Sequence, residues 1–262
     1  MMITQREKKK AKFRFSFILL FIFASFAVCF VFYMKEDFVV TSEMIDNSTD
    51  AVVYIDPVGE SGSVINPVPK GDRKDESYYK NAVFIGNRSL AGLADYGYVP
   101  SENMLVSDSI TPANIGSVIV YVDGVESLIS DAVIRKNASE IYIMVGMEST
   151  KSSDSPGLFD ELEAFVNSVM EQDPDAEIYL MSLLPVPAGA ESSVAYNTDI
   201  DAYNSELLKF ANKMNVRYLD VNTGFKGNDG KLPDSAAEAN GIRLKKEKYG
   251  ELSEYILTHT AG

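Results

Sequence analysis

The sequence predicts an α/β domain in which a parallel β-sheet is covered by helices on both faces, giving three layers. Two observations support this prediction. Beyond residue 77, apolar runs of strand length alternate along the chain with stretches whose apolar residues recur at helical spacing. The composition, 46% hydrophobic and 24% charged over 262 residues, is that of an ordinary globular protein.

The expected elements follow one another in a strand–helix order. The strands are expected over residues 82–86, 141–145, 178–182 and 216–220. The helices are expected over residues 157–172, 198–214 and 245–257. This alternation favours parallel strands joined by crossover helices. A further short strand is expected over 103–106, and residues 117–125 predict a strand that enters a tight turn at Asp123-Gly124, forming a local hairpin.

Charge and rare residues exclude several classes of function. With 24 Lys and Arg against 38 Asp and Glu, the net charge is −14, so nucleic acid is not an expected partner, because binding phosphates needs a basic face. Cys29 and His259 are the only residues of their types. They permit no intramolecular disulfide and no zinc site built from cysteines or paired histidines, and no cofactor is expected. Because His259 stands close to the C-terminus, we do not expect it to be catalytic.

The N-terminal region has the pattern of a membrane anchor. Residues 1–14 carry six Lys and Arg against one acid, and the 20 residues 15–34 carry no charge. A helix of that length spans about 30 Å, the thickness of a bilayer core. The alternative is a cleaved signal peptide, but the apolar stretch exceeds the ~7 to 15 residues typical of one. The positive-inside rule predicts a single-pass protein of the cell membrane, with residues 1–14 cytoplasmic and the rest extracytoplasmic.

Between the anchor and the domain lies a stretch with the composition of a spacer. Residues 35–77 are rich in Asp, Glu, Ser, Gly and Pro and contain only short apolar runs. We therefore expect an extracytoplasmic linker over 35–77 and the folded domain over 78–262. The missing disulfides suit a bacterial cell envelope, because small extracellular domains of animal proteins commonly use them.

Four short stretches of the domain resemble the motifs of one enzyme family in order and spacing. The first, Phe84-Ile85-Gly86-Asn87-Arg88-Ser89, resembles the Phe-Ile-Gly-Asp-Ser block of the SGNH/GDSL hydrolases, the GDSL-like lipases and acylhydrolases. The others cover residues 143–149, 182–186 and 240–244. The likeness extends over about residues 78–258. It implies a flavodoxin-like α/β/α fold, with the site at the carboxyl ends of the strands.

The same resemblance implies that the family's chemistry is lost. The family uses a serine nucleophile, a histidine base with an aspartate three residues before it, and an asparagine that stabilises the oxyanion. At the matching positions this chain has Arg88, Arg243, Asn240 and Glu148, with Asn87 before Arg88 in place of the family's aspartate. Arg243 cannot accept a proton at neutral pH. Ser89 remains a weak alternative nucleophile, one position late.

These substitutions leave two interpretations of the site open. Arg88, Glu148 and Arg243 are expected to meet at the former catalytic cleft, either as an ion-paired plug or as a ligand-binding site, with Asn87, for an anionic group of an envelope glycan. The expected role is binding or scaffolding at the cell envelope, with a cell-wall glycan or an envelope protein as partner. The alternative is an active esterase or acyltransferase of the envelope with a rebuilt site.

Overall fold

The computed structural model describes residues 63–261. The predicted cytoplasmic segment 1–14 and the predicted membrane span 15–34 lie outside the described residues. Within residues 63–261, no helix is both long enough and apolar enough to cross a membrane.

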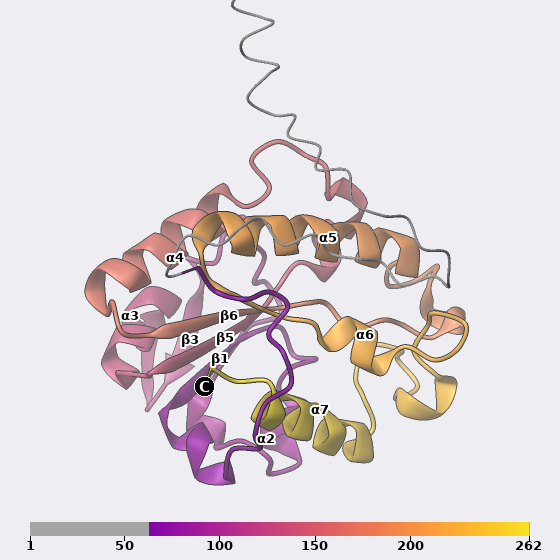
Figure 1. Cartoon of the computed structure of the whole chain (residues 1–262), viewed down its shortest axis with the longest axis horizontal. Coiled ribbons are helices and arrows are strands. Elements are labelled where there is room, and N and C mark those ends of the chain that lie inside the picture. The colour runs from indigo at the N-terminus through magenta and orange to yellow at the C-terminus, as the bar shows by residue number, and fades with distance from the viewer. Residues whose placement is uncertain (1–62, 262) are drawn as a thin grey trace, which may run out of the picture. The chain divides into compact units, whose positions relative to one another are not determined.

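A parallel sheet of five strands forms the centre of the described domain (Figure 1). Its strand order is β2-β1-β5-β6-β7, and all four neighbouring pairs are parallel. This is the order of the flavodoxin-like sheets. The strands are β1 (Ala82–Gly86), β2 (Met104–Val106), β5 (Glu140–Met144), β6 (Glu177–Met181) and β7 (Arg217–Leu219). The predicted parallel α/β sheet is thus confirmed.

Helices cover both faces of the sheet (Figure 1). One face carries α3 (Ile129–Lys136), α4 (Asp160–Gln172) and α5 (Asn197–Met214). The other carries α2 (Gly92–Asp95) and α7 (Lys246–Thr258), and α6 (Val221–Phe225) contacts α7. The 3₁₀ turns are η1 (Glu76–Asn81), η2 (Ser101–Asn103), η3 (Met147–Ser152), η4 (Ala188–Ala190) and η5 (Asp234–Ala236).

One predicted helix begins later than its apolar pattern indicates. The spacing of apolar residues favours a start at 157, but α4 begins at Asp160. Gly157 has φ +79°, a left-handed conformation that an α-helix cannot include. The apolar residue Leu158 therefore packs against the core from a turn.

A row of aromatic rings crosses the middle of the sheet. Phe84, Tyr142 and Tyr179 are paired in register on β1, β5 and β6, and all three are fully buried. Their rings stack with centroids 4.9 and 4.5 Å apart. Because parallel strands place in-register side chains on the same face, this row fixes the register of three strands at once.

The predicted hairpin is present as a separate two-stranded sheet. It consists of β3 (Ile119–Val122) and β4 (Val125–Leu128), which pair antiparallel. The two turn residues Asp123 and Gly124 both have positive φ, +53° and +82°. This is the type I′ geometry that suits a two-residue hairpin loop.

The expected linker over 35–77 is too long at its C-terminal end. Val68 is buried, and its N–H donates to the Tyr218 carbonyl at 2.9 Å. The side-chain amide of Asn66 donates to the Val216 carbonyl at 2.8 Å, and the N–H of Gly71 donates to the Thr258 carbonyl at 2.8 Å. A sequence rich in Pro and Gly indicates irregular backbone but not exposure, and the described part of this stretch packs against the domain.

The left-handed glycine after β5 has a neighbour that leaves no room for a side chain. Gly146 has φ +118°, and a Cβ placed there would lie 2.1 Å from Tyr203 Oη. We expect Gly146→Ala to lower the free energy of unfolding by about 2 kcal/mol or more, because it adds both backbone strain and overpacking. Urea unfolding of the full chain in detergent measures the change.

Gly189→Ala is the matched control, because Gly189 has nothing within 4 Å of such a Cβ. A Gly146→Ala variant as stable as Gly189→Ala would contradict the packing described here.

Candidate functional site

The carboxyl ends of β1 and β2 open into a pocket of about 300 Å³. The strands are in register there, since Gly86 pairs with Val106. Arg88 and Asp108 each follow the last residue of their strand by two positions. In parallel α/β sheets this edge is where ligands bind. The pocket is lined by Arg88, Ala91, Asp95, Val106, Ser107, Asp108 and Arg243.

Arg88 forms a two-point ion pair with Asp108. Its Nη2 lies 2.8 Å from Asp108 Oδ2, and its Nε donates to Oδ1 at 3.2 Å. The side chains are 73% and 59% exposed. An exposed pair of this kind contributes about 0 to 1 kcal/mol. The Arg88 guanidinium can therefore exchange Asp108 for another anion at small cost.

Arg243 is held more firmly on the other side of the pocket. Its Nη2 donates to Asp95 Oδ2 at 2.6 Å, and its side chain is only 22% exposed. The hydrogen bond that it donates to Asp95 raises the pKa of Arg243 above its ordinary value, so the group is a permanent cation. Its Nε is buried without a hydrogen-bond partner, and Glu238 Oε2 lies 3.9 Å from it.

Asn87 and Ser89 bond to each other within the turn after β1. Asn87 Oδ1 accepts a hydrogen bond from the Ser89 N–H at 2.9 Å and another from the Ser89 hydroxyl. This is the arrangement of an Asx turn. The Ser89 hydroxyl proton thus goes to an amide oxygen, which is far too weak a base to activate a nucleophile.

A tyrosine of helix α7 holds this turn through a hydrogen bond to its backbone. The Tyr249 hydroxyl donates to the Ser89 carbonyl oxygen, and burial raises the pKa of Tyr249 to about 12, so the hydroxyl keeps its proton. A Cβ at Gly92 would lie 2.0 Å from the Tyr249 ring. Only glycine leaves room for the ring at this point.

Glu148 does not join the two arginines, which corrects the expected three-residue cluster. It follows Gly146 in η3, which packs on α5, and it does not line the pocket. Among the described residues it forms no ion pair. Partial desolvation raises the pKa of its carboxyl group. Burial raises the pKa of Tyr203 as well, and the Glu148 charge adds to that shift, which places Glu148 beside α5.

Asn240 forms a turn next to Arg243. Its Oδ1 accepts from the N–H groups of Ile242 at 3.0 Å and Arg243 at 3.1 Å. The intervening Gly241 has φ +69°. Asn240 thus holds the backbone of this turn, and its side chain does not orient a catalytic base.

His259 lies at the far end of α7 from Ser89. Its Nδ1 is 2.8 Å from the Tyr255 carbonyl oxygen, and its ring stacks on Tyr255 with centroids 3.8 Å apart. It follows Tyr249, which contacts Ser89, by ten residues, or about 15 Å of helix rise. The described residues contain no cluster of three or more His, Cys, Asp and Glu side chains that could hold a metal ion.

Sequence reasoning missed Asp95 and Asp108, the carboxylates that pair with the two arginines. The signal for Asp108 was in the sequence, because it follows one expected strand at the same distance as Arg88 follows its neighbour. Asp95 lies on the short helix α2, and only the tertiary contact of α2 with α7 brings it to Arg243.

Searches by sequence find no relatives: no protein-family profile matches the chain, and no curated protein matches it. Solved structures do match. A protein provisionally described as a platelet activating factor from Streptococcus pneumonia has a TM-score of 0.52 at 19% identity, over 69% of this chain and 88% of that one. The acetyl xylan esterase AlAXEase has 0.51 at 13%, over 69% and 99%. A GDSL-like lipase from Bacteroides thetaiotaomicron has 0.50 at 14%, over 71% and 89%.

The described domain has the fold of the SGNH/GDSL-like lipases and acylhydrolases. At these low identities the likeness shows the fold alone, because proteins that share a fold can differ in chemistry.

A polar brace holds the loop that follows β6. Asn197 bonds both backbone groups of Val186, at 3.0 and 2.9 Å. Glu191 accepts from the Asn197 side chain at 3.0 Å and forms an ion pair with Lys231. The bonds from Lys231 and Asn197 lower the pKa of Glu191 to about 2.

This brace predicts a defined pH dependence of stability. Since the folded pKa of Glu191 lies below its unfolded value, its contribution is present above about pH 4.5 and is lost as the pH falls towards about 2. We expect Glu191→Gln to lower the melting temperature at pH 7, and the difference from wild type to shrink below about pH 4.

Differential scanning fluorimetry of the full chain from pH 3 to 7 measures this. Glu102→Gln, at an exposed position on η2, is the control. A difference between Glu191→Gln and wild type that is the same at all pH values would contradict the ion-paired brace.

Proposed function

We propose that this protein is a membrane-anchored, extracytoplasmic SGNH/GDSL-like domain that binds a ligand at the cell envelope and lacks serine esterase chemistry. One observation carries the proposal. The pocket at the carboxyl ends of β1 and β2 presents two arginines, Arg88 and Arg243, while the neighbouring Ser89 hydroxyl is bonded to Asn87.

The arrangement does not supply the parts of a serine esterase. Arg243 cannot take a proton from Ser89, because its guanidinium is a permanent cation. The N–H of Ser107, at the end of β2, donates to the Gly86 carbonyl at 3.0 Å and is not free to stabilise an oxyanion. His259, the only histidine, belongs to the other end of α7.

The same arrangement suits an anionic ligand. Asp95 and Asp108 balance the two arginines, so the charged side chains that line the pocket sum to zero. Glu238, outside the lining, lies 3.9 Å from Arg243. The Arg88–Asp108 pair is exposed and weak, so a carboxylate or phosphate that enters the pocket can replace Asp108. Arginine is well suited to this exchange because its planar fork binds carboxylate and phosphate at two points.

The ligand class that we propose is an anionic or acylated glycan of the cell envelope. Two considerations support it: the membrane span predicted at residues 15–34 and its flanking charges predict a domain outside the cell, and one solved structure of this fold is an acetyl xylan esterase. A domain that keeps such a fold without the chemistry would bind or scaffold at the envelope.

The first prediction concerns catalysis. We expect the full chain in detergent to neither hydrolyse nitrophenyl acetate above background nor react with a fluorophosphonate serine probe, because Ser89 has no base. An active serine esterase is the positive control. Turnover or labelling that disappears in Ser89→Ala would overturn this part of the proposal and identify the alternative, an envelope esterase or acyltransferase with a shifted nucleophile.

The second prediction concerns binding. With a uronate oligosaccharide as the probe, we expect Arg88→Ala/Arg243→Ala to weaken binding at least tenfold, because charge-assisted hydrogen bonds contribute about 1.5 to 3 kcal/mol each. Isothermal titration calorimetry measures the affinity.

Arg73→Ala is the matched control, since Arg73 also pairs with carboxylates, Glu76 and Glu254, but does not line the pocket. Equal binding by wild type and the double variant would reject the arginine site.

A further inference from the structure

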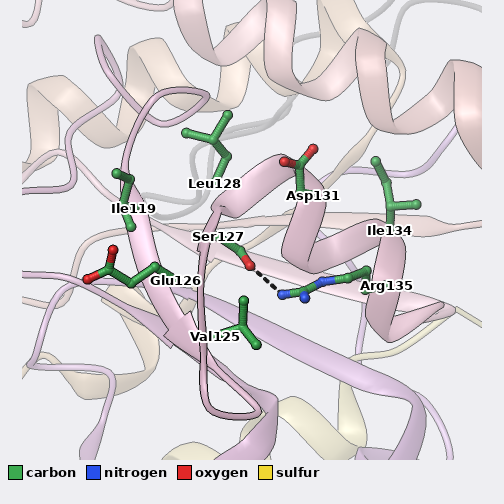
Figure 2. A pocket seen from close by; sticks show the side chains of 8 residues that line it. All are labelled: Ile119, Val125, Glu126, Ser127, Leu128, Asp131, Ile134 and Arg135. Atoms are coloured by element: carbon green, nitrogen blue, oxygen red, sulfur yellow. Dashed lines mark hydrogen bonds between the residues drawn. The ribbon is translucent and has the colours of Figure 1, made fainter.

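The β3–β4 hairpin exposes an unusual amount of apolar surface. Val125 is 50% exposed and Tyr121 is 73% exposed, and further exposed apolar side chains lie beside them. They line or flank a groove of about 720 Å³ between β4 and α3 (Figure 2). The exposed apolar residues of this surface, which we call the hairpin face, are Ile119, Tyr121, Val125, Leu128 and Ile134.

Strand β4 is the outer strand of the hairpin. β3 contacts β2 of the main sheet and alternates exposed and buried residues, whereas no residue of β4 is buried. β4 is short, but its edge carries Val125 and Leu128, and open strand edges in native proteins are normally covered or blunted because they pair with other strands.

The hairpin register shows which backbone groups of β4 are unpaired. In a two-residue hairpin the residues next to the turn, Val122 and Val125, exchange hydrogen bonds with each other, and the pattern then alternates. The bond from the Ile129 N–H to the Val118 carbonyl, 3.0 Å, agrees with this alternation. The N–H and C=O groups of Glu126 and Leu128 therefore point away from β3, into the open edge.

The groove carries charged side chains of both signs that form no ion pairs. Among the residues that the structure describes, Glu126 and Asp131 are in no ion pair, and Arg135 bonds only the Ser127 hydroxyl and no carboxylate. All three line the groove (Figure 2). A surface that carries both a cation and anions outside ion pairs can form contacts of opposite charge with a second copy across a two-fold axis, where the same patch faces itself.

We propose that the hairpin face binds a second copy of this chain, through antiparallel pairing of β4 with β4 of the partner across a two-fold axis at Ser127. With this axis, the outward-facing Glu126 of one copy pairs with Leu128 of the other, so both open residues of each edge are used.

Moving the axis by one residue to Glu126 would place the two Glu126 carboxylates directly opposite each other, which is unfavourable. The chosen register instead joins the two hairpins into one four-stranded antiparallel sheet. The face that carries Ile119, Tyr121 and Leu128, together with Glu126, continues across the axis. The proposal is independent of the ligand pocket, because the two surfaces share no lining residue.

Cross-linking tests the register directly. Antiparallel residues that face each other without exchanging hydrogen bonds have Cα atoms about 4.5 Å apart, which is within the range that a disulfide spans. In the full chain with Cys29→Ser, we expect Ser127→Cys to form a disulfide-linked dimer under mild oxidation, while Ser168→Cys on α4 stays monomeric on non-reducing gels.

The strength of association is measured by sedimentation of the full chain in detergent, with Cys29→Ser as the background. We expect a dimer, and Leu128→Glu should raise its dissociation constant roughly tenfold or more, because it places a carboxylate directly opposite Glu126 of the partner. Met170→Glu is the matched control, since Met170 and Leu128 are 38% and 39% exposed.

Three results would overturn the proposal. The first is a monomer at all concentrations, which would leave the edge to a strand from a different protein. The second is a dimer that Leu128→Glu does not weaken, which would place the contact elsewhere in the chain. The third is Ser127→Cys cross-linking no more than Ser168→Cys.

Discussion

The close approach of β1 to its neighbour β5 is the constraint on which this domain depends. Gly86 ends β1, and a Cβ at that position would lie 2.6 Å from the Met144 carbonyl oxygen. Because Gly86 has no side chain, β1 can lie between β2 and β5 up to its last residue. The chain then turns at Asn87-Arg88-Ser89, and that turn leaves Arg88 at the open edge of the sheet. The pocket therefore lies at this edge because position 86 is a glycine, which lets β1 pair with both neighbours up to the turn.

The pocket and the core have different energetic roles. The stacked rings of Phe84, Tyr142 and Tyr179 are fully buried, and burying such side chains supplies most of the free energy of folding. The exposed Arg88–Asp108 pair contributes little to stability. The residues at this side of the pocket can therefore change without loss of the fold.

The sequence predicted the secondary structure well wherever the apolar pattern was decisive. The expected strand 82–86 and the expected helices 198–214 and 245–257 agree with β1, α5 and α7 to within one residue, because fully buried strands and long amphipathic helices have unambiguous periods. Of the expected linker, the described residues 63–77 were misinterpreted. Its Asn66 and Val68 pair with Val216 and Tyr218 over about 150 positions of sequence, and no local pattern encodes such contacts.

In the candidate site, too, the features set by local pattern were predicted and the contacts distant in sequence were not. The two arginines were expected at one cleft, and both line the pocket, since their positions follow from strand ends and the order of the sheet. Their partners were predicted wrongly. Glu148 was expected between them because the resemblance assigned it to the family's asparagine position, but Gly146 turns the chain towards Tyr203, and Glu148 follows it.

Charge balance at the pocket depends on tertiary contacts that the motifs do not contain. A cluster of two arginines and one glutamate would carry a net positive charge, whereas the pairs with Asp95 and Asp108 bring the charges that line the pocket to a sum of zero. A neutral pocket does not attract every anion at long range. It favours one that fits between the guanidinium groups closely enough to replace a carboxylate already there, so selectivity would come from geometry at contact distance.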